Sequence, residues 1–80
     1  MYHAYILRSI PFPLETYVGF TTGISARLAK HNEGGCPHTS KFKPWQVIFY
    51  CAFQNKLRAL QFEKYLKSHS GKAFAAKHLL

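Results

Sequence analysis

The chain has 80 residues, which predicts a single domain over residues 1–80 and leaves no room for a second. Eleven Lys and Arg stand against three acidic residues, and a formal charge of +8 indicates a polyanionic partner. Nucleic acid is favoured over a membrane surface because the basic residues are spread along the chain, and a merely soluble basic protein is the plainer alternative.

Cysteine usage and the first residues of the chain indicate the compartment. The two cysteines lack the close spacing of a redox or zinc pair and make no disulfide framework. The first apolar run ends at Arg8, so we expect no signal peptide, and no run approaches membrane-spanning length. A reducing cytoplasm is the expected setting.

The first third of the chain predicts an antiparallel hairpin. Residues 2–8 are rich in Tyr, Ile and Leu without a turn residue, and residues 16–20 form a second predicted strand. Pro11 and Pro13 lie between them, where they remove backbone donors and fix φ. The short connection favours antiparallel pairing of the two strands.

A helix and a basic loop follow the hairpin. Residues 24–31 predict a helix with an apolar stripe, and we expect a capping residue within Thr21–Gly23. Residues 32–35 should end this helix. Residues 36–44 are predicted to form a basic loop.

The second half predicts a strand and two helices. Residues 45–53 are the strongest strand signal, and their continuous apolar run suggests contacts on both faces of a sheet. A long helix is predicted from Asn55 to about Ser68, with a break at Gly71 and a last helix over residues 72–80. The order β-β-α-β-α-α predicts an α+β fold in which helices cover a small, mainly antiparallel sheet.

One carboxylate lies on the apolar side of the predicted long helix. At about 100° per residue, Glu63 falls within an arc formed by Ala59, Leu60, Phe62 and Leu66. A carboxylate there is costly unless it is paired, protonated or bound to a metal. One interpretation is a salt bridge to Lys67, four residues on. The other is a hard cation such as Mg²⁺ or Mn²⁺, which combines one carboxylate with waters and substrate phosphate oxygens.

Arg27 and His31 lie four residues apart and share one face of the first predicted helix. Arg27 can clamp a phosphate, and His31 can hydrogen-bond a leaving oxygen or relay a proton near neutral pH. Each also has a plainer interpretation when taken alone. Arg27 can be a solvated surface charge, and His31 a helix-terminal residue favoured by the helix dipole.

Tyr5 and Tyr17 lie on the two strands of the predicted hairpin, where tyrosine is ordinary core material. A phenol with a pKa of about 10 is a poor base. Beside Arg27, a metal ion and other cations its phenolate would become more accessible and could take a proton from an attacking water.

Other residues allow weaker readings. Cys36, His38 and His31 could belong to a zinc site, but their spacing is not standard and a fourth ligand is not evident. Among the aromatic residues that could stack bases, Phe42 is flanked by two lysines and is the one we most expect to be exposed. The candidate contacts to a nucleic-acid backbone are Lys41, Lys43, Lys64 and Lys67.

The ordered set of motifs resembles the GIY-YIG nuclease family. Ala4-Tyr5-Ile6 and Tyr17-Val18-Gly19 resemble the paired motifs that name the family. Arg27 follows the second motif by eight residues, in a stretch similar to the family's Arg-containing helix. That stretch ends in His31-Asn32, as in the small single-domain bacterial members.

The resemblance covers nearly the whole chain. Pro44-Trp45 before an apolar strand, and residues 62–68 around Glu63, are similar to the rest of those members. The chain departs from the family pattern at Ala4 and Val18, which replace Gly and Ile. It also has no Asn after Asn55, where many members carry one.

The resemblance implies a three-stranded antiparallel sheet flanked by helices and an endonuclease that hydrolyses DNA phosphodiester bonds with one Mg²⁺ or Mn²⁺ ion, in DNA repair or recombination. It implies that Tyr5 and Tyr17 line the site and that Arg27 contacts the scissile phosphate. It also implies that His31 lies near the nucleophile and that Glu63 holds the metal. Two alternatives stay open: a nucleic-acid-binding module on the same fold without catalysis, and an interaction or structural domain whose charge is incidental.

Overall fold

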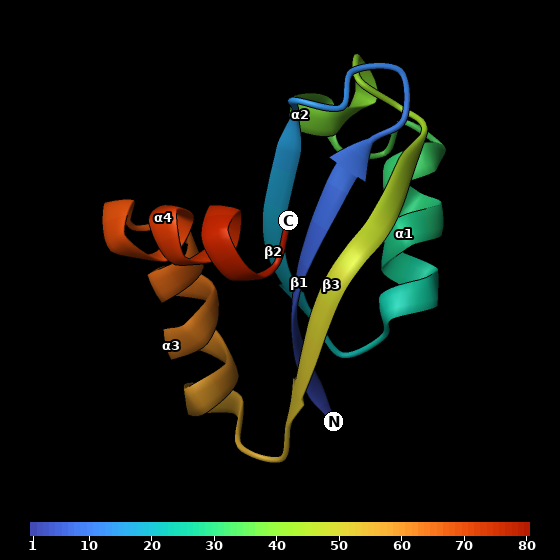
Figure 1. Ribbon diagram of the computed structural model, residues 1–80. Helices are drawn as coiled ribbons and strands as arrows, with labels where there is room; N and C mark the ends of the chain where they lie inside the picture. The colour runs from blue at the N-terminus through green and yellow to red at the C-terminus, as the bar shows by residue number, and fades with distance from the viewer.

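The computed structural model describes residues 1–80 and contains a three-stranded antiparallel sheet with helices on both faces (Figure 1). The strands are β1 (Tyr2–Ser9), β2 (Thr16–Thr21) and β3 (Trp45–Phe53). They lie side by side in the order β2-β1-β3, so β1 is the central strand and β2 is an edge. The predicted α+β class and the order of the elements are confirmed.

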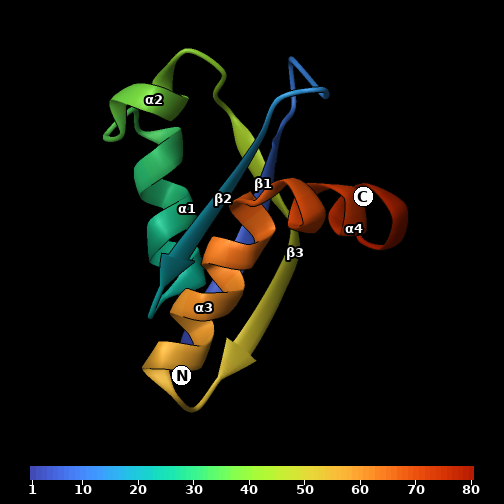
Figure 2. The same cartoon turned by 90° about the vertical axis from the view of Figure 1, so that its left-hand side faces the viewer.

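The helices divide between the two faces of the sheet. Helix α1 (Ile24–Asn32) covers one face, and α3 (Lys56–Lys67) with α4 (His69–His78) covers the other, as the two views of Figures 1 and 2 show. The short helix α2 (Pro37–Ser40) lies beyond the end of α1. None of these helices combines the length and the hydrophobicity needed to cross a membrane.

Strand β1 separates two small hydrophobic cores. Successive side chains of a strand point to opposite faces, so Tyr5 faces α1 whereas Ile6 faces α3. Tyr5 packs with Leu7 and Trp45 in the first core, and Ile6 packs against the α3 and α4 side chains in the second. The polar groups on the Tyr5 face are thereby held apart from the apolar packing under α3.

The segment between α1 and β3 differs from the predicted loop. Pro37 occupies the first turn of α2, where its fixed φ favours a helix and its missing N–H costs nothing. Phe42 is half-buried, with its ring 5.6 Å from that of Phe12 and 6.4 Å from that of Trp45, centroid to centroid. The prediction that Phe42 is the exposed aromatic residue is therefore wrong, and Tyr50 on β3 is the more exposed ring.

The break between the last two helices lies at Ser68 and not at Gly71. The Ser68 backbone is extended, and its hydroxyl accepts a hydrogen bond from the Gly71 N–H at 3.1 Å, which caps α4. Gly71 is buried in the first turn of α4, where a Cβ would overlap the Tyr65 carbonyl. The glycine therefore permits the close approach of α3 and α4, and our prediction that it ends a helix is wrong.

Helix starts follow the sequence in one case and not in another. The Asn55 side chain accepts a hydrogen bond from the Arg58 N–H at 3.1 Å and caps α3, as its position indicated. Helix α1 instead begins after Gly23 without a side-chain cap. Thr21 hydrogen-bonds the Gly23 backbone N–H at 3.1 Å and so stabilises the turn that precedes the helix.

Candidate active site

Three of the predicted site residues meet in the core beneath α1. The Tyr5 hydroxyl lies 3.1 Å from Nε2 of His31, and the Tyr17 ring centroid lies 5.0 Å from that of the imidazole. Tyr5 is 2% exposed and His31 is fully buried, whereas Tyr17 on the edge strand is only partly buried. Tyr17 is therefore the member of the cluster that faces solvent.

The hydrogen bonds around His31 determine its tautomer. Its Nδ1 lies 2.9 Å from Oγ1 of Thr39, and that hydroxyl donates to the Cys36 carbonyl at 3.3 Å. A hydroxyl has one proton to donate, so Thr39 must accept from Nδ1–H of His31. Nε2 then carries a lone pair, and Tyr5 donates its O–H to it.

Burial decides the ionisation of both buried members. It lowers the pKa of His31 below its ordinary 6.5, and the nearby Arg27 charge lowers it further, so the imidazole is neutral at pH 7. Burial raises the pKa of Tyr5 above 10.0, and this effect outweighs the lowering by Arg27. Within the protein alone, Tyr5 is therefore a hydrogen-bond donor to His31 and not an easily ionised phenol.

Arg27 lies at the edge of this cluster on α1. Its guanidinium lies near the Tyr5 phenol, and interaction with this group raises the pKa of Arg27. Its Nε is buried and has no partner within the protein. The guanidinium therefore has at least one donor to offer an anion.

Glu63 lies on α3, on the opposite side of the sheet. Its carboxylate forms an ion pair with Lys67 at 2.6 Å, which is the salt bridge that the sequence offered as one interpretation. The Glu63 side chain is 17% exposed, against 54% for Lys67. The helical periodicity thus placed Glu63 correctly beside the apolar face of α3. Leu60, in contrast, is 37% exposed and lies outside that face.

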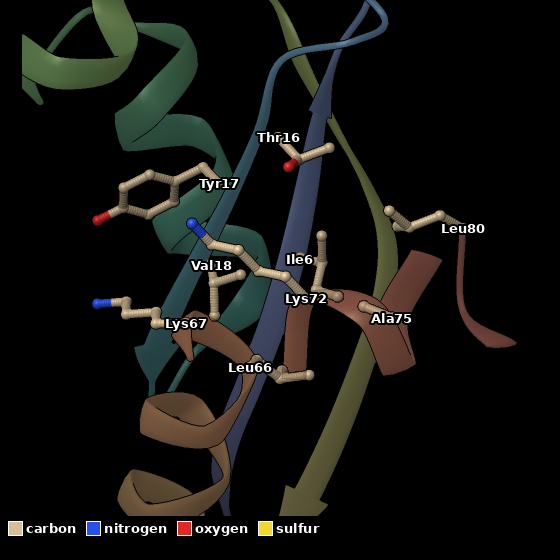
Figure 3. A pocket seen from close by; sticks show the side chains of 9 residues that line it. All are labelled: Ile6, Thr16, Tyr17, Val18, Leu66, Lys67, Lys72, Ala75 and Leu80. Atoms are coloured by element: carbon tan, nitrogen blue, oxygen red, sulfur yellow. The ribbon is translucent and has the colours of Figure 1, made fainter. Parts of the chain in front are cut away.

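A pocket at the β2 edge joins the two sides. It has a volume of about 450 Å³, and the side chains with polar groups that line it are those of Thr16, Tyr17, Lys67 and Lys72 (Figure 3). Tyr17 borders the pocket and also contacts His31, and Lys67 borders it and also pairs with Glu63. The pocket therefore borders the solvent-facing phenol on one side and the ammonium partner of Glu63 on the other, but Glu63 itself does not line it.

The other candidate residues lie outside this cluster. All four predicted backbone contacts (Lys41, Lys43, Lys64 and Lys67) are exposed. Lys41 places its Nζ 5.9 Å from the centre of the Phe42 ring. No group of three His, Cys, Asp or Glu side chains is arranged to hold a metal ion, so the zinc reading of Cys36 and His38 has no ligand set.

Sequence reasoning missed the residues that hold the cluster in place. The Asn32 side chain accepts from the Trp45 N–H at 2.6 Å and donates to its carbonyl at 3.2 Å. The Trp45 indole N–H donates to the Thr39 carbonyl at 2.8 Å. The His-Asn pair at the end of α1 was the one available signal, whereas nothing in the local pattern marked Thr39.

The chain is similar to known proteins along most of its length. The family described as "GIY-YIG catalytic domain" matches residues 1–77. Similar curated proteins are the structure-specific endonuclease subunits SLX1 of Candida dubliniensis, of Debaryomyces hansenii and of Malassezia globosa, which are 38%, 41% and 37% identical. The matches cover 98%, 82% and 98% of this chain.

The chain spans only 28%, 21% and 19% of the length of these three relatives. None of the three comes from a bacterium, so they lend no support to the bacterial type in the resemblance. The family match nevertheless extends over almost every residue, from the first strand into the last helix. The chain therefore belongs to the GIY-YIG family.

Proposed function

We propose that the chain is a metal-dependent endonuclease domain that hydrolyses phosphodiester bonds in DNA, in repair or recombination. Its membership of the family and its similarity to proteins named structure-specific endonuclease subunits support this proposal. We further propose that it recognises DNA by shape and works beside a partner subunit, as those names imply for the relatives. The observation that carries the proposal is the guanidinium of Arg27 held against the buried Tyr5–His31 pair.

Arg27 is the residue that would bind the scissile phosphate. Its guanidinium lies near the Tyr5 phenol, and its buried Nε has no protein partner. Donors that are already in place stabilise the charge that grows on the phosphate oxygens without reorganisation during the reaction. A merely solvated surface arginine would not need a buried phenol to orient it.

The tyrosines and His31 would handle the proton of the attacking water. Tyr17 is the solvent-facing phenol, so a water beside the phosphate can contact it. Behind it, the neutral His31 can accept the Tyr5 proton at Nε2 as the Tyr5 oxygen takes the proton that the attacking water loses. The hydroxide then forms the new P–O bond, and the leaving oxygen departs and takes a proton from solvent.

Glu63 is the residue that would hold the metal ion. A single carboxylate that is mostly covered suits Mg²⁺ or Mn²⁺, which keep several waters and use phosphate oxygens as further ligands. Such an ion, when bound, lowers the pKa of its water and polarises the phosphate. Lys67 neutralises the same carboxylate, so binding of the ion requires Lys67 to turn away.

Cleavage assays test the proposal directly. Purified protein is incubated with branched, single-stranded and duplex DNA in Mn²⁺, beside Arg27→Ala, Glu63→Ala and the control Lys30→Ala. Lys30 is exposed on the same helix as Arg27. We expect the first two variants to lose about 100-fold or more of the rate, and the control to retain it. Cleavage that no variant reduces would trace to a contaminant and sink the proposal.

The Glu63–Lys67 ion pair favours a second candidate, a nucleic-acid-binding module that does not cleave. In that case the Glu63 carboxylate only stabilises α3, through its ion pair with Lys67 four residues later. DNA binding would fall steeply with salt, would not depend on the metal, and would be unchanged in Glu63→Ala. The same preparations distinguish the two candidates, because the module shows no cleavage on any DNA.

A further inference from the structure

The pocket at the β2 edge has two chemically distinct parts. Its floor is apolar and comes from strand and helix side chains that include Ile6, Val18 and Leu66. Its polar part comes from Lys67 and Lys72, together with Thr16 and Tyr17. Figure 3 shows Lys72 extending across the pocket toward Tyr17, with Lys67 below it.

This combination fits an amphipathic anion. No acidic side chain lines the pocket, and although the Lys67 ammonium is paired with Glu63 outside it, no ion pair engages the Lys72 ammonium. Its volume of about 450 Å³ lies within the range of about 300–1,000 Å³ that is usual for small-molecule sites. A bare phosphate would leave the apolar floor unused, whereas a nucleotide would fill both parts.

We propose that the pocket holds the deoxyribonucleotide next to the scissile phosphate, with Lys72 and Lys67 on its own phosphate and the sugar and base on the apolar floor. The charge of the chain, +8, and the shared wall at Tyr17 argue for a DNA strand over a protein segment. This inference rests on the proposed function, because it places the DNA backbone between Arg27 and the β2 edge. It assigns to Lys72 a contact that the sequence did not suggest.

Two charge-matched variants test the role of Lys72. Lys72 and Lys77 are both exposed on α4, but only Lys72 lines the pocket. Binding of fluorescent single-stranded DNA is measured by anisotropy in EDTA, which prevents cleavage. We expect Lys72→Met to weaken binding by about threefold to tenfold and to reduce the salt slope by about 0.7, the value for one phosphate contact on a single strand. Lys77→Met should change the affinity by less than about twofold. Equal losses in the two variants would overturn the inference.

A second measurement identifies what enters the pocket. Amide chemical shifts are followed by NMR during titration with the dinucleotide pTpT and, separately, with inorganic phosphate. We expect pTpT to move the amides of Val18, Ala75 and Leu80, and phosphate to leave them unchanged. Equal shifts with both probes would reduce the pocket to an anion site and overturn the nucleotide assignment, as would no shift with pTpT.

Failure of this inference is distinguishable from failure of the proposed function. If Lys72→Met binds DNA normally but cleavage still requires Arg27, the nuclease stands and the pocket assignment falls. If Lys72→Met weakens binding but no DNA is cleaved, the proposed function fails. The pocket then still binds a nucleotide, but in a module that does not cleave DNA.

Discussion

Gly19 lies directly beneath the phenol ring of Tyr5. The two residues pair across the β1–β2 ladder, and a Cβ at position 19 would overlap the Tyr5 hydroxyl and ring carbons. The glycine of the second motif is thus the space that lets the tyrosine of the first motif reach His31. This relationship explains in steric terms why the two motifs need each other.

Replacement of Gly19 by alanine should therefore displace Tyr5. We expect Gly19→Ala to cost about 1–3 kcal/mol of unfolding free energy, the range for overpacking a tight core. Cleavage should also fall, because Tyr5 positions Arg27. The matched control is Gly23→Ala, since a Cβ there would meet nothing within 4 Å. Urea unfolding checks both variants, and equal stabilities would contradict this account.

The two tyrosines should separate stability from activity. Tyr5→Phe leaves the buried Nε2 of His31 without its donor, which should cost about 1–3 kcal/mol of unfolding free energy. Tyr17→Phe removes a hydroxyl that faces solvent, so the unfolding free energy should change by less than about 0.5 kcal/mol. Both variants should cleave more slowly. Parallel unfolding and cleavage measurements check this, and a Tyr17→Phe enzyme of full activity would refute the role of Tyr17.

The stability of the protein should fall as the pH falls below 6.5. His31 titrates near 6.5 when the chain is unfolded, but burial lowers its pKa in the folded protein. Below pH 6.5 the unfolded state gains a proton that the folded state does not, so the free energy of unfolding decreases until the folded pKa is reached. Urea unfolding from about pH 8 to about pH 5 measures this slope. The slope should be smaller in His31→Gln, and an unchanged slope would assign it to other groups.

Lys67 should compete with the metal ion for Glu63. We expect Lys67→Met to bind Mn²⁺ more tightly than the parent protein by about twofold to tenfold, because a paired ammonium no longer has to be displaced. Glu63→Gln should abolish this binding. Lys64→Met controls for the general loss of positive charge, because Lys64 lies on the same helix and is also exposed to solvent. Electron paramagnetic resonance of free Mn²⁺ reports the affinity without any cleavage, and equal affinities in the two lysine variants would refute the competition.

The sequence predicted most of the fold because the periodic signals were local and strong. The apolar run from Trp45 to Phe53 predicted β3, and the capping residue Asn55 predicted the start of α3. Gly71 could not be interpreted in the same way, since its role depends on how closely α4 approaches Tyr65. A glycine required by a tertiary contact looks, in sequence, like a glycine that ends a helix.

The candidate site was predictable as a set of residues but not as an arrangement. The proximity of Tyr5, Tyr17 and His31 followed from their strand and helix positions once the sheet was known. The raised pKa of Tyr5 could not be predicted from the sequence, because burial of that phenol depends on Gly19 and on the packing of α1. The choice of Lys67 as the partner of Glu63 was one of two readings that the helix periodicity allowed.

The outer side of β2 has no neighbouring strand, because β1 is its single partner in the sheet. Tyr17 and the pocket that we assign to the substrate both lie along this free edge. An additional strand that hydrogen-bonded to β2 would cover this edge and shield the phenol from DNA. A peptide or a second copy of the chain that added a strand to β2 would thus inhibit the domain without contacting Arg27 or Glu63.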